Sequence, residues 1–351
     1  MKKLAVFGAA LAALAATIHA GESVQQERLM AALRDLPTQR AALGDAASRE
    51  GLRETEKLIE ARLRALGYEP TSHEFRWALP ARKFGDAQDV KAEEHTYRNL
   101  SVDITGKETP GEVLIVGAHF DTVPGTPGAD DNGTGTAALL ELAHVLKDRP
   151  MKRTVRLVFF NLEEVGLVGS TRFVKVLREA GAIGKAAGDN TTQPSKDAAP
   201  TERVIGMISL ESIGYFSDEP GSQKSPIPPI KDVFEPPTVG DNITLVGFAR
   251  DGAFVQTLER GMRAASPELK VAAFAFPMPL PDLMRSDHAP FYAAGVPAVM
   301  LTDTANFRNP NYHKPTDTVE TLDPVRFTRV VAGVVGAVEA VAGKAATTDA
   351  D

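Results

Sequence analysis

Short apolar runs alternate with amphipathic stretches through most of this 351-residue chain, and this alternation constrains the fold more than any other feature. Residues 113–118, 155–160 and 204–210 are almost entirely apolar, and helical patterns over residues 134–147 and 170–180 separate them. Strands that are buried on both faces are typical of parallel sheets covered by helices. The alternation therefore predicts an α/β fold around a largely parallel sheet.

The other expected elements complete one domain over residues 21–351 without a linker between separate cores. They are a helix over residues 48–66, strands over 72–78, 96–105, 244–247 and 298–302, and a last helix over 324–342. Residues 72–78 and 96–105 alternate between polar and apolar, as antiparallel edge strands do. We expect a mostly parallel mixed sheet with helices on both faces and antiparallel strands at one edge.

Two segments interrupt this pattern. Residues 181–201 are rich in small and polar side chains and predict a surface insertion. Residues 217–240 carry many prolines and directly follow an expected strand end. Because long loops in compact domains are often functional, we expect part of this segment to form one wall of a substrate pocket that prefers apolar or medium-sized terminal residues. The alternative is a surface arm packed on the domain's own helices.

The first twenty residues have the pattern of a secretory signal peptide. Lys2 and Lys3 precede an apolar stretch that ends near Ile18, and the small residue Ala20 follows. This pattern predicts cleavage after Ala20 and export to the periplasm or the medium. The stretch is short for a membrane anchor, which needs about 20 apolar residues, so we expect no stable membrane association.

The composition disfavours two kinds of binding partner and rules out disulfide bonds as a source of stability. The formal net charge of −7 disfavours nucleic acid and anionic membrane surfaces. The chain has no cysteine, so an exported fold must rely on its core and not on disulfides. Hydrophobic residues make up 43% of the chain, which is an ordinary share for a globular protein with such a core.

Acidic and imidazole side chains follow the expected strands. Glu163 and Glu164 come just after the run 155–160, and His119 and Asp121 follow the run 113–118. Adjacent buried carboxylates repel each other unless a cation compensates them, and an aspartate near a metal-binding histidine fixes its orientation. The alternative interpretation, without a metal, is that the two glutamates are an exposed pair and that His119 is a surface histidine near a turn.

Three further groups are expected at the same edge of the sheet. Asp131 lies at the start of a helix, where it predicts either an N-cap or a bridging metal ligand. Glu211 follows the run 204–210, and His313 lies in a polar loop before the last helix. Two imidazoles and three carboxylates suit two zinc ions that share one carboxylate, and two dications with one hydroxide balance those three negative charges.

Four motifs in fixed order resemble the di-zinc exopeptidases, a family that includes secreted bacterial aminopeptidases, glutamate carboxypeptidase II and glutaminyl cyclases. They are residues 119–121 (HFD), 128–133 (GADDNG), 161–166 (NLEEVG) and 312–318 (YHKPTDT). The resemblance covers about residues 97–342 and implies a zinc aminopeptidase-like catalytic domain.

The resemblance also implies a role for each site residue. It implies two Zn²⁺ per chain, with His119 and Glu211 as ligands of separate metals, Asp131 as the bridge, and Glu164 and His313 as the remaining ligands. Glu163 resembles the general base, Asp121 the partner of His119, and Tyr312 a hydroxyl that supports the tetrahedral intermediate.

One ligand departs from the pattern, and one histidine is left over. Glu211 stands where the best-known aminopeptidases have aspartate, so metal preference and substrate fit can differ. The segment 286–291 also resembles a family segment, and we interpret His288 as structural or substrate-adjacent because both histidine ligand places are filled.

The expected reaction is hydrolysis of a peptide bond next to a chain terminus, with peptides as substrates. An acidic site suits an α-ammonium group, which favours an aminopeptidase over a carboxypeptidase of the same fold. A loop arginine would reverse that preference, and Arg250, Arg285 and Arg308 are the candidates. The sequence is also compatible with a one-zinc glutaminyl cyclase and, less well, with a catalytically inactive binding module.

Overall fold

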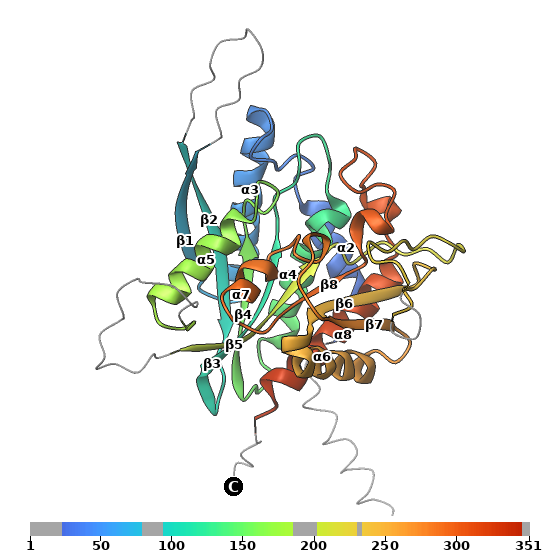
Figure 1. Cartoon of the computed structure of the whole chain (residues 1–351). Coiled ribbons are helices and arrows are strands. Elements are labelled where there is room, and N and C mark those ends of the chain that lie inside the picture. The colour runs from blue at the N-terminus through green and yellow to red at the C-terminus, as the bar shows by residue number, and fades with distance from the viewer. Residues whose placement is uncertain (1–22, 79–93, 185–201, 230–233, 346–351) are drawn as a thin grey trace, which may run out of the picture.

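One eight-stranded mixed sheet runs through the molecule (Figure 1). The computed structural model describes residues 23–78, 94–184, 202–229 and 234–345, so the predicted signal peptide and most of the predicted insertion over 181–201 lie outside the described residues. The strand order is β1-β2-β4-β3-β5-β8-β6-β7. The strands are β1 (Thr71–Ala78), β2 (Glu94–Ile104), β3 (Thr109–His119), β4 (Arg153–Phe160), β5 (Arg203–Glu211), β6 (Asn242–Phe248), β7 (Lys270–Phe276) and β8 (Ala298–Thr302).

The centre of the sheet is parallel, as predicted. Strands β4, β3, β5 and β8 pair in parallel, and β1 and β2 form the predicted antiparallel edge. The direction expected for residues 244–247 was wrong, because β6 pairs with β8 antiparallel. The described parts of residues 212–241, which join β5 to β6, contain no crossover helix, so β6 starts at the edge where β5 ends.

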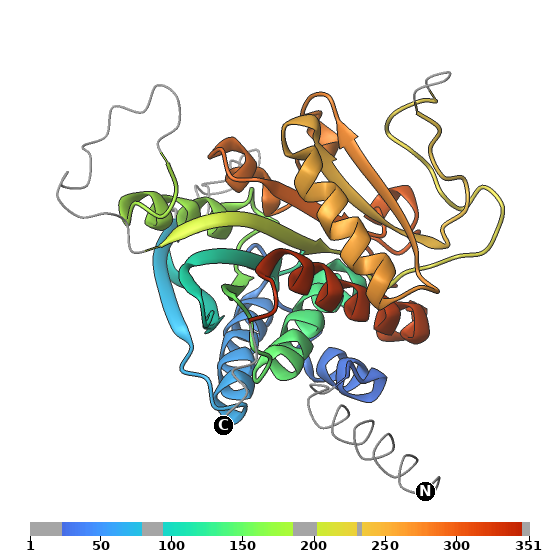
Figure 2. The same cartoon turned by 90° about the horizontal axis from the view of Figure 1, so that it is seen from below.

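Helices cover both faces of the sheet (Figure 2). They are α2 (Gln26–Asp35), α3 (Ala46–Ala65), α4 (Gly135–Leu146), α5 (Val168–Glu179), α6 (Gly252–Ala265), α7 (His288–Ala293) and α8 (Pro324–Ala342). Helices α5 and α7 lie on one face; α2, α3, α4 and α8 lie on the other, with α6 packed against α8. The sequence predicted α3, α4, α5 and α8 and missed α2, α6 and α7, as well as the strand β7.

Side chains of β3 show why the sheet needs two layers of helix. Val113 and Ile115 belong to the apolar cluster under α5 and α7, while Leu114 and Val116 belong to the larger cluster under the other helices. Successive residues of a strand point to opposite faces, so an uninterrupted apolar run must be covered on both sides.

The order of the strands positions the functional groups. Strands β4, β3 and β5 are neighbours and run in the same direction, so their carboxyl ends lie side by side at one edge. Ligand sites of open α/β sheets form at this edge. Among the described residues, no helix is long and apolar enough to cross a membrane.

Candidate metal centre

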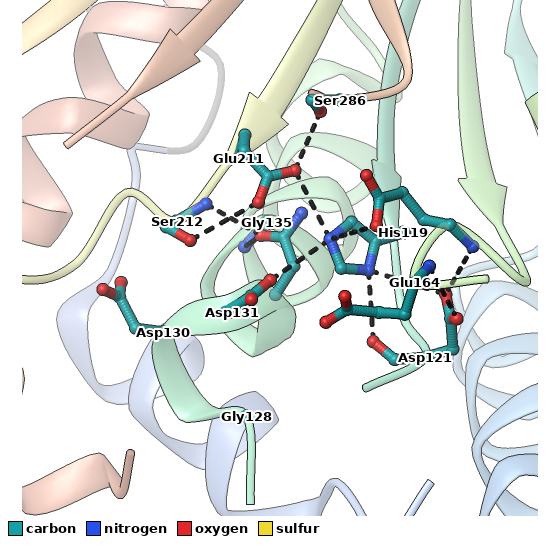
Figure 3. A network of polar contacts seen from close by, with 12 residues as sticks. His119, Asp121, Gly128, Asp130, Asp131, Gly135, Glu164, Glu211, Ser212 and Ser286 are labelled. Carbon is teal, nitrogen blue, oxygen red and sulfur yellow. Dashed lines mark hydrogen bonds and ion pairs between the residues drawn. The ribbon is translucent and has the colours of Figure 1, made fainter. Parts of the chain in front are cut away.

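The carboxyl ends of β3, β4 and β5 bring the predicted site residues together. His119 is the last residue of β3, Glu211 is the last of β5, and Glu163 follows the end of β4 by three residues. Asp131 lies in η1 (Ala129–Thr134), which leads into α4, and its φ of −102° and ψ of 96° are not helical. His313 lies in the loop before α8. Figure 3 shows the His119 imidazole between Glu211 and Asp131.

The donor atoms form two groups of three. In the first, His119 Nε2 lies 3.3 Å from Glu211 Oε2 and 3.9 Å from Glu163 Oε2. The second group holds Asp131, Glu164 and His313. His119 and Glu211 thus face the same point, so the expectation that they bind separate metals was wrong. The reason is that β3 and β5 are adjacent and end side by side.

Asp131 belongs to the second group and also faces the first. Its Oδ1 is 3.3 Å from His119 Nε2, and its Oδ2 is 3.0 Å from His313 Nε2. Glu164 Oε2 lies 3.4 Å from the same His313 nitrogen. One carboxylate that faces both imidazoles has the arrangement that a bridging ligand requires.

Several of these buried donor atoms make no hydrogen bond. His119 Nε2, Asp131 Oδ1 and Glu164 Oε1 are buried, and none has a hydrogen-bond partner within the described parts of the chain. A buried polar atom without a partner is costly unless an ion or water satisfies it. Nitrogen and carboxylate donors of this number suit two zinc ions, so the residues fit the metals that the sequence predicted.

Several buried carboxylates lie close together in the centre and repel one another. Burial raises the pKa of Glu163 well above its ordinary value, and the neighbouring Glu211 adds to the shift. Burial and the charge of Asp131 raise the pKa of Glu164 to about 7. Burial lowers the pKa of His313, but contacts with Asp131 and Glu164 outweigh it and raise the pKa to about 10. A dication relieves such crowding of carboxylates.

Asp121 supports the glutamate pair through the backbone. Its Oδ1 accepts the Glu163 N–H at 3.0 Å, and its Oδ2 accepts the Glu164 N–H at 3.2 Å. The Nδ1 of His119 lies 3.1 Å from the Asp121 main-chain oxygen and 3.5 Å from its Oδ1. Asp121 therefore contacts His119, as predicted, and in addition fixes the turn that presents both glutamates.

Asp317 performs the same task for Asp131, and the sequence prediction missed it. Its Oδ1 accepts the Asp130 N–H at 3.0 Å, and its Oδ2 accepts the Asp131 N–H at 3.2 Å. The available signal was its place in the motif at residues 312–318, four residues after His313. Asp317 and the backbone groups that it accepts from are far apart in the sequence. No local sequence pattern therefore predicts this contact, and only the fold reveals it.

Glu211 is held by a serine that the sequence did not single out for this role. Ser286 Oγ donates to Glu211 Oε2 at 2.8 Å and lies 2.9 Å from Ser209 Oγ. His288 lies in neither donor group, is fully buried and contacts the Leu283 carbonyl at 2.8 Å. Burial lowers the pKa of His288 to about 4, so it is a neutral core residue, in line with its structural interpretation.

The backbone around the centre takes unusual conformations. Leu162, Ser212 and His313 have φ values of 59°, 48° and 57°, in the left-handed region. Few residues other than glycine adopt such angles, and they persist where the surrounding structure fixes them. Each of the three is a donor residue or the neighbour of one. The constrained backbone at these positions therefore fixes the direction of the donor side chains.

Tyr312 stands at the border of the centre. Its ring stacks on His313 with centroids 3.8 Å apart, and its hydroxyl accepts a hydrogen bond from Arg285 Nη2 at 2.9 Å. The other arm of Arg285 donates to Asn306 Oδ1 at 2.7 Å. The tyrosine hydroxyl is therefore held beside the donor groups by a fixed guanidinium.

An apolar cavity adjoins the centre and shares Glu211 and Tyr312 with it. The larger apolar side chains of its lining are Ile227, Phe234, Val246, Phe274, Phe276, Leu283, Met300 and Phe307. Part of the proline-rich segment lines this cavity, and that the cavity is the predicted substrate pocket stays a prediction. The segment is anchored through Gln223 and Lys224, which bond to Thr304 and to the Phe307 carbonyl.

The chain is similar to a known peptidase family and to several proteins of known sequence or structure. A family model described as Peptidase family M28 matches residues 99–338. The Escherichia coli K12 protein named as uncharacterized protein YfbL is 34% identical over 258 residues, which are 71% of this chain and 72% of that protein. The zinc aminopeptidase BSAP from Bacillus subtilis has a TM-score of 0.64 and 16% identity over 93% of this chain and 97% of its own. A glutaminyl cyclase from Fimbriiglobus ruber has a TM-score of 0.62 and 19% identity over 91% and 96%.

Proposed function

The chain belongs to peptidase family M28, and from this premise we propose that it is a zinc-dependent aminopeptidase that removes apolar residues from peptide N-termini. The family predicted from the ordered motifs is confirmed, since the matched residues 99–338 nearly coincide with the expected range of 97–342. The observation that carries the proposal is the pair of three-residue donor groups, with Asp131 facing both.

The proposed metals are two zinc ions. His119 and Glu211 would hold one ion, Glu164 and His313 would hold the other, and Asp131 would contribute to both. The support is the distance of 3.3 Å from His119 Nε2 to Glu211 Oε2 and of 3.4 Å from His313 Nε2 to Glu164 Oε2. When bound, zinc ions lower the pKa of a water molecule and polarise the carbonyl of the scissile bond.

Glu163 is the proposed general base. The other five donor residues suffice for two metals, which leaves the Glu163 carboxylate free to take a proton from the attacking water and pass it to the leaving amine. Its position is supported by the hydrogen bond from its N–H to Asp121. Tyr312, held by Arg285, is the proposed donor to the oxygen that develops negative charge.

The contacts of three arginines favour an aminopeptidase over a carboxypeptidase. Arg250 is paired with Asp251 and bonds the carbonyls of Tyr292 and Val296. Arg308 is buried and donates to Gln223 and the Asn242 carbonyl. Arg285 lines the apolar cavity, but its guanidinium already donates to Asn306 Oδ1 and to the Tyr312 hydroxyl. The acidic centre supplies the complementary charge for a substrate's α-ammonium group.

The cavity beside Glu211 and Tyr312 is the proposed pocket for the terminal side chain. Its walls are apolar and partly aromatic, as in pockets that bind apolar groups. We also propose that the protein is exported, on the basis of Lys2, Lys3 and the apolar stretch that precedes Ala20.

Activity assays combined with metal counting test this function. The zinc-loaded protein is assayed on aminoacyl-4-nitroanilides, on peptides with a blocked N-terminus and a free C-terminus, and on peptides that begin with glutamine. We expect hydrolysis of unblocked substrates and two zinc ions per chain. Cyclisation of N-terminal glutamine with one zinc ion identifies the protein as a glutaminyl cyclase instead, a reaction whose enzymes share this fold. Cleavage of blocked peptides identifies a carboxypeptidase.

A further inference from the structure

A buried arginine outside the matched family residues reaches the metal centre. Arg40 lies in the segment between α2 and α3, well before residue 99, and is 1% exposed. Its Nε donates to the Phe120 carbonyl at 2.7 Å, and its Nη1 donates to the carbonyls of Pro37 at 2.9 Å and Pro127 at 2.6 Å. Its Nη2 donates to the Gly128 carbonyl at 2.5 Å.

These carbonyls mark both ends of the loop between two metal ligands. Phe120 directly follows His119, and Gly128 lies three residues before Asp131. The loop over residues 120–128 therefore starts and ends on the same guanidinium. The main chain adds a further bond, because the Thr122 N–H donates to the Arg40 carbonyl at 3.1 Å.

The fit around Arg40 leaves little freedom for a different arrangement. Gly128 has a φ of 62°, and a Cβ atom there would meet Arg40 Nη2 at 3.0 Å. A planar guanidinium spreads its five N–H donors in a fixed fork, whereas a lysine offers one point of attachment. Three different nitrogens of Arg40 are used, so the contact depends on the shape of the group as well as on its charge.

We propose that Arg40 is a positioning residue of the metal centre, which sets the separation of His119 and Asp131 by holding both ends of the loop that joins them. This inference rests on the proposed zinc function. Arg40 touches no proposed metal donor atom through its hydrogen bonds, all of which go to main-chain oxygens. It acts through the backbone, as Asp121 and Asp317 do.

Charge and position make opposite contributions to zinc affinity. Removal of a buried positive charge makes an acidic centre more attractive to a cation. Removal of the loop contacts loosens two ligands, and losses of supporting contacts typically weaken metal binding by about 10–100-fold. Arg40→Lys keeps the charge and removes the fork, whereas Arg40→Met removes both, so together they separate the two effects.

The decisive measurement is the zinc dissociation constant, determined by competition with a chelator. We expect both variants to bind zinc about 10–100-fold more weakly than the wild type, and hydrogen exchange in the loop over residues 120–128 to rise in the zinc-free protein. The matched control is Arg149→Met, because Arg149 bonds the Val145 carbonyl and Glu339 between α4 and α8. The control should lower thermal stability and keep wild-type zinc affinity.

Distinct outcomes separate this inference from the function on which it rests. Wild-type affinity in both Arg40 variants, or an equal loss in Arg149→Met, overturns the positioning role and leaves the proposed function intact. A wild-type chain that binds no zinc overturns both. If Arg40→Met does not fold, Arg40→Lys and the hydrogen exchange of its loop decide alone.

Discussion

The metal centre and the apolar cavity meet at Glu211 and Tyr312, yet the two regions are built in different ways. The centre takes its donors from the ends of three adjacent parallel strands, from η1 and from the loop before α8. Buried aspartates hold the backbone at Asp130 and Glu163. The cavity takes its walls from β6, β7, β8 and an irregular proline-rich segment. Regular elements place the donor residues, and an irregular segment forms part of the adjoining cavity.

This difference implies that rate and preference can be altered separately. Changes in the centre should affect all substrates alike, because every substrate would need the same proposed metals and the same proposed base. Changes in the cavity should reorder substrates and leave the metals in place, because apolar contacts distinguish side chains by size and shape. Single substitutions in the two regions test that separation, and the largest effect is expected at the base.

Glu163→Gln should give the largest loss of activity. The amide keeps the size of the side chain and removes the base, so turnover of every substrate should fall by about 10²–10⁴-fold or more. Zinc content should match that of the wild type. Steady-state kinetics with elemental analysis of the purified protein checks both parts.

Glu164→Gln is the matched variant at the neighbouring position. A neutral amide is a weak zinc ligand, so this protein should lose zinc from the group that contains Asp131 and His313. Dialysis against a graded chelator series measures the loss. Were Glu163→Gln to lose zinc and Glu164→Gln to keep it, the roles of the two glutamates would be reversed.

Asp317→Asn should have a smaller effect on the same centre. One oxygen of Asp317 becomes an NH₂ group, so one of the N–H groups of Asp130 and Asp131 loses its acceptor. We expect zinc affinity to fall by about 10–100-fold. Asp121→Asn is the matched change beneath Glu163 and Glu164, and it should weaken zinc binding while also lowering turnover.

Unchanged zinc affinity in Asp317→Asn would mean that this carboxylate supports the fold alone. Chelator competition and thermal unfolding, measured on the same preparations, distinguish the two cases. A drop in the melting temperature without a change in zinc affinity indicates a structural role only.

The same contrast explains what the sequence could and could not predict. His119, Glu163, Glu164 and Glu211 were found because each follows an apolar run whose direction and burial are readable from hydrophobic pattern. Arg40 and Asp317 were missed because their partners are main-chain groups far away in the sequence. Such contacts follow from the fold and leave no local pattern.

Errors in the cavity region have a related cause. The sequence placed residues 244–247 in the parallel series and did not predict β7 or α6. A strand's pattern records which faces are buried, but it does not record its direction, which depends on where the preceding connection leaves the chain. The described part of the segment before β6 is irregular, so the direction in which β6 enters the sheet could not be predicted from the sequence.

Phe234→Leu should have the smallest effect and the most selective one. Phe234 lies 5.1 Å from Phe274 and 5.7 Å from Phe276 between ring centroids, and all three line the cavity. A smaller side chain removes contacts from a large terminal residue, while a small terminal residue never reaches them. We expect kcat/KM for phenylalanyl and leucyl substrates to fall by roughly tenfold relative to alanyl substrates, which is the scale of one or two lost methylene contacts.

Zinc content and turnover of alanyl substrates should stay at wild-type values in this variant. Phe254→Leu is the matched control, because Phe254 belongs to α6 and packs against Gly206 of β5, away from the cavity lining. It should change stability without reordering the substrates. An identical ranking in Phe234→Leu and the wild type would show that the terminal side chain binds elsewhere. The cavity would then have no part in specificity, and the proline-rich segment would serve the stability of the domain.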